Sequence, residues 1–470
     1  MVELLVKKTT GLDFPAFIEK EILSPLGMNH SRYPLASFRE GSFAKPYAGE
    51  QPLQQEYVGP LASGGLYSTP SDLTRFAAML IGKGGLRGKR ILSSESVVAM
   101  GVDQTAHNFN PLPSGFFRNG LGWDSVDQEG MALFGVKAWE KGGDTNSYGS
   151  MLIVLPEEGL SVAVTGASGL HSGDAKTIAE KVLARALVEN GRLAAMPVPA
   201  PATARQTATV PPEMLKNMPG VYVSFNAVFR VDLDADGILS FHGYKNDAWA
   251  QAIQGMSYRD DGWFSASSAD APPINLTWIA ADGRGYLAIR MPSAQGWYRT
   301  TMLFAQKLAP QAPLSPLWQK RMGMTWVPVN YAAEDDYLAQ GANPRIWLKA
   351  IDGADGYVFS FGPDGWMTTK PATENGEYES RSFILIPQIN GRDLCDVNVI
   401  PRNGEEWLRE TSTLYRPLDS VPALGFGESR VTTGPEGYAE WRRLPPEAQF
   451  TVTGAKSFKF YDADFALQNT

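Results

Sequence analysis

A chain of 470 residues is too long for a single hydrophobic core, so about two to four domains are expected. Its formal net charge of -8 and the absence of a basic block argue against nucleic acid as the main partner. The single cysteine excludes an intrachain disulfide framework. The sequence contains no run of about 18 apolar residues, so no membrane span is predicted. The four histidines lie far apart, so we expect no metal and no cofactor.

Two helices are predicted at the start of the chain. The first covers residues 1–9 and ends at Gly11, with no capping residue before it. The second begins after Asp13, a plausible N-cap, and carries apolar residues on one face. We expect it to stop within Ser24-Pro25-Leu26-Gly27-Met28, because the residue before a proline leaves the helical region.

Three more helices are predicted from capping residues and apolar stripes. Thr69 caps a helix that ends at Gly82. A shorter helix opens at Ser93 or Ser94, and a long one follows Ser172 as its cap.

A strand–turn–strand pattern lies between the last two of these helices. The apolar runs 151–155 and 160–164 are short and β-branched, and Pro156-Glu-Glu-Gly159 separates them as a tight turn. Just upstream, Lys141 is followed by two glycines, and a residue without a Cβ lets a ligand lie against the backbone. A lysine on such a strand edge can hold an anionic or oxyanionic group.

The segment Lys141-Gly142-Gly143, followed by Thr145 and Tyr148, resembles the third motif of the serine β-lactamase and penicillin-binding-protein superfamily. In that superfamily the motif lies on the strand at the edge of the active site. Three other blocks occur in the order that the resemblance implies: Thr10-Gly11, Pro25-Leu26-Gly27-Met28, and residues 64–73 with their paired glycines.

The resemblance implies a serine hydrolase that transfers the acyl group of amide, peptide or ester bonds. It assigns Lys141, Gly143 and Asp144 to catalysis, with the Asp144 backbone N–H as an oxyanion donor, and Gly142, Thr145 and Tyr148 to substrate binding. Lysine rather than histidine in this motif points to carboxylate-bearing substrates. Ser147 stands where the superfamily usually has glycine, which leaves the width of the cleft open.

The resemblance also implies a Ser-x-x-Lys and a Tyr-x-Asn motif before Thr10, and this sequence has neither there. The letters Ser-x-x-Lys occur at residues 42–45, but Pro46 follows at once and disfavours a helix. The letters Tyr-x-Asn occur at residues 244–246, in a strand-rich region. We therefore expect an N-terminally truncated domain, residues 1–195, and no nucleophile in this chain.

Three interpretations remain open. The nucleophile is encoded upstream of this sequence, or a separate polypeptide supplies it, or the chain is a non-catalytic member that binds a ligand or peptide. The expected partner is a small-molecule or peptide substrate, and a homo-oligomer remains open. No signal peptide is recognisable at Met1, although the resemblance implies a periplasmic or extracytoplasmic protein.

The second half of the chain predicts β structure. Residues 196–210, rich in alanine, proline and threonine, form the predicted linker. Short alternating strands follow, with a break near residue 313, so we expect modules at 211–312 and 313–470. The fold class is then α+β: a partial β-lactamase-like α/β domain, an antiparallel sheet with helices, followed by one or two antiparallel barrels or sandwiches. Residues 232–237 match the start of a calcium loop, but their flanking strands favour a hairpin turn.

Overall fold

The computed structural model of the chain divides into two compact units. The first contains Met1–Thr203 and Arg290–Met302, and the second contains Ala204–Ile289 and Leu303–Thr470. The residues that the structure describes are 1–39, 41–112, 117–199, 205–266, 273–331, 343–362, 365–387, 391, 394–445, 449, 451–454 and 458–468.

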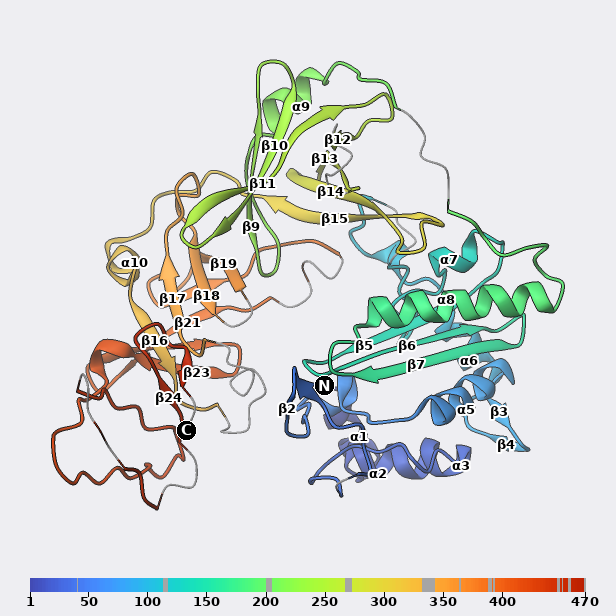
Figure 1. The fold of residues 1–470 in the computed structure, drawn as a ribbon, viewed down its shortest axis with the longest axis horizontal. Helices are drawn as coiled ribbons and strands as arrows, with labels where there is room; N and C mark the ends of the chain where they lie inside the picture. Colours follow the sequence, from blue (N-terminus) through green and yellow to red (C-terminus); the bar gives the residue numbers. More distant parts are fainter. Residues whose placement is uncertain are drawn as a thin grey trace. The chain divides into compact units, whose positions relative to one another are not determined.

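The first unit contains helices around a small sheet (Figure 1). Its strands are β5 (Trp139–Asp144), β6 (Tyr148–Leu155) and β7 (Leu160–Ala167), with the short pairs β1 (Tyr47–Ala48), β2 (Gln51–Pro52), β3 (Gly85–Leu86) and β4 (Lys89–Arg90). Its helices are α1 (Val2–Thr10), α2 (Phe14–Ile18), α3 (Ser24–Leu26), α4 (Leu61–Gly64), α5 (Pro70–Ile81), α6 (Ser94–Met100), α7 (Glu129–Ala132) and α8 (Ser172–Glu189), with a π-helical turn at Glu19–Leu23 and a 3-10 turn at Thr105–His107.

The three long strands form an antiparallel sheet in the order β5-β6-β7. The pair β6 and β7 is the predicted strand–turn–strand, with Leu155 opposite Leu160 across the turn. On its other side β6 pairs with all six residues of β5, from Trp139 opposite Val154 to Asp144 opposite Gly149. This strand prediction is confirmed, and it makes β5 an edge of the sheet.

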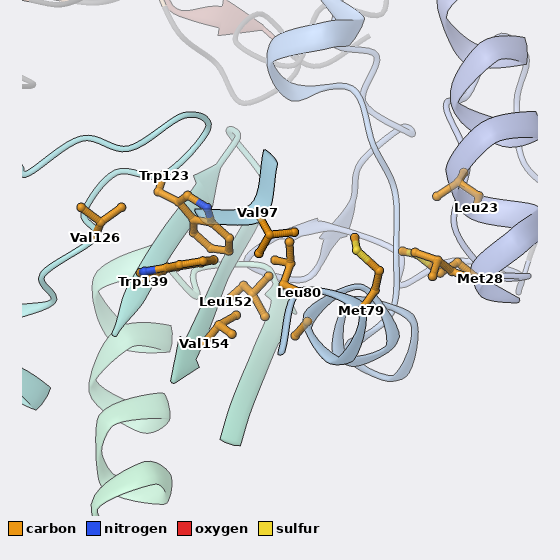
Figure 2. Close-up of a cluster of buried hydrophobic side chains, with 12 residues drawn as sticks. Leu23, Met28, Met79, Leu80, Val97, Trp123, Val126, Trp139, Leu152 and Val154 are labelled. Carbon is orange, nitrogen blue, oxygen red and sulfur yellow. The ribbon is translucent and has the colours of Figure 1, made fainter. Parts of the chain in front are cut away.

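Both faces of the sheet are covered by helices. Side chains alternate along a strand, so neighbouring residues of β6 point to opposite faces. Met151 and Ile153 pack in a cluster with the apolar residues of α8. Leu152 and Val154 pack on the other face, in the cluster that contains Leu80 of α5 (Figure 2). Each fully buried side chain of this kind contributes about 1.5–3 kcal/mol.

Two helices have the N-caps that the sequence predicts. The Thr69 hydroxyl accepts a hydrogen bond from the Asp72 N–H, and the helix that it caps ends before Gly82. Ser93 caps α6 by accepting from the Ser96 N–H at 3.1 Å. These two predictions are confirmed.

Two predicted helix boundaries differ in detail from the structure. The N-terminal helical run stops within residues 24–28, as predicted, but at Gly27, which has φ 67°, whereas Ser24 before the proline stays helical. The π-helical turn just before Ser24 shifts the backbone register, and Pro25 then stands in the first turn of a new segment, where proline needs no N–H partner. The long helix α8 begins at Ser172 with His171 as its N-cap, one residue earlier than predicted.

Two closed antiparallel barrels lie mostly in the second unit, although the end of β14 and the start of β15, within Arg290–Met302, are grouped with the first unit. The first is built from β8 (Gly220–Val223), β9 (Val228–Leu233), β10 (Ile238–Lys245), β11 (Ala248–Tyr258), β12 (Phe264–Ala266), β13 (Asn275–Ala281), β14 (Arg284–Pro292) and β15 (Arg299–Lys307). The second is built from β16 (Thr325–Pro328), β17 (Ile346–Lys349), β18 (Val358–Gly362), β19 (Gly365–Pro371), β20 (Glu379–Arg381), β21 (Val397–Arg402), β22 (Glu405–Glu410) and β23 (Thr413–Pro417).

Smaller elements accompany the barrels: α9 (Pro212–Asn217), α10 (Pro316–Arg321), the 3-10 turn Leu418–Ser420, β24 (Phe460–Tyr461) and β25 (Leu467–Gln468). Pairing of β16 with both β17 and β23 closes the second barrel. The fold is therefore α+β with antiparallel barrels, as predicted. Part of the predicted linker, residues 200–204, lies outside the described residues.

The calcium-like pattern lies in the turn between β9 and β10. The Asp234 carboxylate accepts hydrogen bonds from the N–H groups of Asp236 and Ile238, at 3.0 and 2.8 Å. The two strands pair directly after it, with Leu239 opposite Leu233. The interpretation of this segment as a hairpin turn is confirmed.

Candidate functional site

The outer edge of β5 is partly paired, and the pairing fixes which way its backbone points. The Glu140 N–H donates to the Ser125 carbonyl at 2.8 Å, and the Glu140 carbonyl accepts from the Asp124 N–H at 3.0 Å. The Gly142 N–H donates to the Asp124 carboxylate at 2.8 Å. Because the backbone groups of a strand alternate in direction, the Asp144 N–H also points to this edge. An oxyanion donor needs that orientation, and the assignment of Asp144 stays a prediction.

Lys141 is held beside this edge by a carboxylate. Its side chain is 47% exposed, and its ammonium group lies 3.1 Å from the Asp124 carboxylate and donates to the Gly142 carbonyl. The ammonium group of Lys141, which we expected to bind a substrate carboxylate, therefore already has an anionic neighbour. This weakens the expectation of carboxylate-bearing substrates, while the catalytic assignment of Lys141 stays a prediction.

The two glycines of the motif allow close packing within the domain. A Cβ on Gly142 would lie 3.3 Å from the Ser172 Cβ and 3.4 Å from the end of Met151. A Cβ on Gly143 would lie 2.8 Å from the Ser150 hydroxyl, which donates to the Gly143 carbonyl at 3.1 Å. Gly143 itself is exposed. The approach of a substrate to these two residues stays a prediction.

Asp144 joins the end of β5 to the start of α8. Its carboxylate accepts from the Ser172 N–H at 2.7 Å and from the Ser172 hydroxyl. An anion at a helix N-terminus is stabilised by about 0.3–1 kcal/mol. One turn further along the same face, the buried Glu140 carboxylate forms an ion pair with Lys176 at 3.0 Å. The side chain of Asp144 is thus bound to the helix on one face of the sheet, whereas its backbone N–H lies in the plane of the sheet and points to the outer edge.

The loop after β5 is organised by hydrogen bonds from distant segments. The Thr145 hydroxyl donates to the Glu56 carboxylate and accepts from the Tyr148 N–H at 3.1 Å. The Tyr148 hydroxyl donates to the Ala44 carbonyl at 2.6 Å, and its ring lies edge-on to that of Tyr67, 5.4 Å between centroids. Burial, together with Tyr148 and Glu56, raises the pKa of the Tyr67 hydroxyl, which donates to the Glu56 backbone carbonyl. Thr145 and Tyr148 thus shape the rim, and their contact with substrate stays a prediction.

Sequence reasoning missed Glu56. It lies in an irregular polar stretch with no motif or periodicity, so no local signal marks it. Its side chain is nevertheless only 8% exposed, and it reaches the rim from a position 89 residues before Thr145. Only the three-dimensional structure brings the two together.

The Ser-x-x-Lys letters at residues 42–45 do not begin a helix. Ser42 lies in an exposed bend, and its hydroxyl donates to the Arg39 carbonyl at 2.6 Å. Residues 244–246 lie at the end of β10, where Asn246 has a positive φ of 48°. Ser147, in the loop between β5 and β6, is buried, at 4% exposed.

A cavity of about 380 Å³ lies elsewhere in the first unit. Residues that line it include Gly101, Asp103, Arg118, Val126 and Lys137, but not the segment 141–144. The rim residues Lys141, Gly143 and Asp144 are exposed. Within the described residues, the segment 141–144 therefore lies outside this cavity, and its role in a site stays a prediction.

The residues that the structure describes contain neither a membrane-spanning helix nor a cluster of metal ligands. No helix among them is both long and apolar enough to cross a bilayer. No group of three or more histidine, cysteine, aspartate or glutamate side chains within them is arranged to hold a metal ion.

Comparisons with known proteins place the first unit. Residues 1–186 match the family model described as Beta-lactamase. Two curated proteins of Mycobacterium tuberculosis, Uncharacterized protein MT1414 of strain CDC 1551 / Oshkosh and Protein Rv1367c of strain ATCC 25618 / H37Rv, are each 32% identical over 126 residues. The match covers 23% of this chain and 31% of each relative, so the chain spans about a third of their length.

Among solved structures, a crystal structure of SurE is 18% identical, covering 65% of this chain and 66% of that chain with a TM-score of 0.41. A class C β-lactamase is 20% identical, covering 39% of this chain and 54% of that chain with a TM-score of 0.31. Both TM-scores are below 0.5, so the assignment rests on the family model. Residues 1–186 of the chain are thus similar to the Beta-lactamase family.

Proposed function

We propose that this domain provides the substrate-holding edge of a serine hydrolase that transfers acyl groups from amide, peptide or ester bonds. One observation carries the proposal. Asp144 is anchored through its carboxylate to Ser172 while its backbone N–H points to the open edge of β5. A fixed N–H at such an edge is the kind of preorganised donor that stabilises an oxyanion.

Each residue of the edge has a part in this reaction. As a serine oxygen attacks the carbonyl carbon, negative charge develops on the carbonyl oxygen, and the Asp144 N–H donates to it. Lys141, held by Asp124, places its ammonium group beside the same edge, where it stabilises negative charge and orders the proton relay. Gly143 is exposed and has no side chain, so a substrate backbone can approach it.

The attacking serine is not among the 470 residues in this proposal. The letters Ser-x-x-Lys occur once, at residues 42–45, and the structure places them in a bend. The nucleophile needs a helix, because in a helix a serine and a lysine three residues later face the same side. A segment or polypeptide outside this sequence would supply the nucleophile and the second wall of the cleft.

A second candidate function is ligand or peptide binding without catalysis. It is favoured by the same bend at Ser42 and by the engagement of Lys141 with Asp124. In both candidate functions the ligand binds at the edge of β5. They differ in whether a nucleophilic serine is brought to that edge.

The test uses the purified chain with nitrocefin, a p-nitrophenyl ester and a D-amino-acid amide. We expect no turnover above that of a Lys141→Ala variant. Co-expression with a polypeptide that carries Ser-x-x-Lys and Tyr-x-Asn should then give turnover that Lys141→Ala abolishes. Turnover by the chain alone, clearly above the Lys141→Ala control, would overturn the proposal that the nucleophile lies elsewhere. Ligand binding without restored turnover would favour the second candidate.

A further inference from the structure

The cavity of about 380 Å³ lies beside the segment that leads into β5. Its walls come from three segments, 101–103, 118–127 and 132–137, and no residue of the β5 edge lines it. Pockets that bind small molecules have volumes of about 300–1,000 Å³. Ala132, Gly135 and Lys137 line the cavity and are exposed, so small solutes can enter from that side. The cavity is therefore both large enough and open enough for a small ligand.

One part of the cavity wall is apolar. Val126 and Val136 line it, and both are buried, at 3% and 2% exposed. Gly101 also lines it, and a Cβ on this glycine would lie 2.2 Å from the Trp139 ring. The indole therefore packs directly behind the backbone of Gly101, with no side chain between them. A ligand with an apolar part can bury that part against this wall.

The indole behind the wall carries an unsatisfied hydrogen-bond donor. Trp139 is 5% exposed and packs against Trp123, with 5.5 Å between the ring centroids (Figure 2). Within the described part of the chain, neither indole N–H has an acceptor. Trp139 Nε1 would lie 2.9 Å from a Cβ on Gly101, so this donor is next to the cavity wall. Buried donors are normally paired, and an unpaired N–H leaves a positive partial charge behind the wall.

The charged residues that line the cavity are unequally engaged. Arg118 and Asp127 form an ion pair at 3.1 Å. The Asp103 carboxylate accepts from the Thr105 N–H at 2.8 Å and from the Thr105 hydroxyl at 2.5 Å. Among the residues that the structure describes, the Lys137 ammonium group has neither a hydrogen-bond acceptor nor a carboxylate within 4 Å. The charged group without a partner at this cavity is therefore a cation.

We propose that this cavity is a second ligand site, which binds a small organic anion. Lys137 and Arg118 hold the carboxylate of the ligand, and Arg118 keeps its bond to Asp127. The apolar part of the ligand lies against Val126 and Val136. A lysine has three N–H donors and an arginine has five, so both can donate to one carboxylate. This site goes beyond acyl transfer and does not depend on it, because no residue of the β5 edge takes part.

The test compares three probes that share a benzene ring and differ in charge: benzoate, benzamide and benzylammonium. Ligand-observed NMR titration of the full chain should show benzoate binding about tenfold or more tightly than benzamide, as a charge-assisted hydrogen bond predicts. Lys137→Gln removes the charge and keeps most of the length of the side chain. It should abolish the preference for benzoate and leave the affinity for benzamide unchanged. Arg118→Gln should also weaken benzoate binding, since the second cation is lost.

A matched control is available on α8. Lys181→Gln removes the same charge from an exposed position outside the cavity and should leave all three affinities unchanged. Thermal unfolding checks that each variant is folded. Benzoate binding that Lys137→Gln leaves unchanged would refute the proposal, as would tighter binding of benzylammonium than of benzoate. A benzoate Kd above about 10 mM for the unaltered chain would refute it too. None of these results bears on acyl transfer, which the Lys141→Ala comparison tests separately.

Discussion

The carboxylate of Asp144 accepts two hydrogen bonds from Ser172, one from the backbone N–H at 2.7 Å and one from the hydroxyl. This contact joins the last residue of an edge strand to the first residue of α8. It gives a side-chain role to a residue whose backbone carries the predicted chemistry.

The first prediction concerns this pair. Asp144→Ala should lower the free energy of unfolding by about 1 kcal/mol, because the N-terminus of α8 loses a capping carboxylate. Ser172→Ala should lower it by less, since the backbone N–H still donates. Urea denaturation of both single variants and the double variant measures the coupling. Strictly additive losses would show that the two residues do not act as a unit.

The second prediction concerns two glycines near this contact. A Cβ on Gly149 would lie 1.9 Å from the Leu170 carbonyl oxygen, so Gly149→Ala should lose about 3 kcal/mol or more by forcing the backbone apart. Gly173, in the first turn of α8, has nothing within 4 Å of its Cβ position. Gly173→Ala is therefore the matched control and should be neutral or slightly stabilising. Equal stabilities of the two variants in urea would contradict the packing described here.

The third prediction separates Lys141 from Asp124. Their ion pair is partly exposed, at 47% and 33%, so Lys141→Ala should change the free energy of unfolding by less than about 1 kcal/mol. Asp124→Ala should lower it by more, because the Gly142 N–H also loses its acceptor. Asp124→Asn keeps an oxygen that can accept from the Gly142 N–H. Its loss of unfolding free energy should therefore lie between those of Lys141→Ala and Asp124→Ala. A larger loss for Lys141→Ala than for Asp124→Ala in thermal unfolding would refute this ranking.

The fourth prediction is a pH dependence that involves Glu129. Burial raises the pKa of its carboxyl above the ordinary value of 4.5, although the Thr300 hydroxyl and Lys176 oppose the shift. Between 4.5 and the raised pKa the folded state binds more protons than the unfolded state. The free energy of unfolding therefore falls as pH rises through this window, by about 1.4 kcal/mol for each unit of pKa difference.

Glu129→Gln should flatten this dependence and raise stability at neutral pH relative to pH 4.5. Urea denaturation at a series of pH values measures it. Glu189→Gln, at an exposed position on α8, removes the same charge and serves as the control. An unchanged slope in Glu129→Gln would mean that this carboxyl does not carry the effect.

Local patterns in the sequence predicted the elements that local physics determines. Thr69 caps its helix because its hydroxyl reaches an N–H three residues away, and the strand pair β6–β7 is joined by a four-residue turn. The stop near Pro25 was predicted for the wrong reason, because Ser24, the residue before the proline, stays helical and Gly27 ends the run. The π-helical turn before Ser24, whose hydrogen bonds span five residues, let the run continue.

The rim required contacts that no local pattern encodes. Asp144 and Ser172 are 28 residues apart, and Glu56 and Thr145 are 89 apart. A family resemblance in the sequence pointed to residues 141–144. No pattern in the sequence predicted that Lys141 pairs with Asp124 or that Glu56 is buried. Closure of the barrels is similar, since alternating strands predicted antiparallel β structure but not the pairing of β16 with β23.

Binding of the substrate at the edge of β5 is reported directly by the Asp144 amide. Gly-Asp occurs twice in the sequence, at 143–144 and 173–174, so carbonyl-¹³C glycine with ¹⁵N aspartate gives two amide signals. Gly173→Ala removes the second signal and assigns the first. On titration with D-alaninamide we predict that the Asp144 signal shifts while the Asp174 signal stays. A titration in which the probe binds and the Asp144 signal does not move would contradict the account.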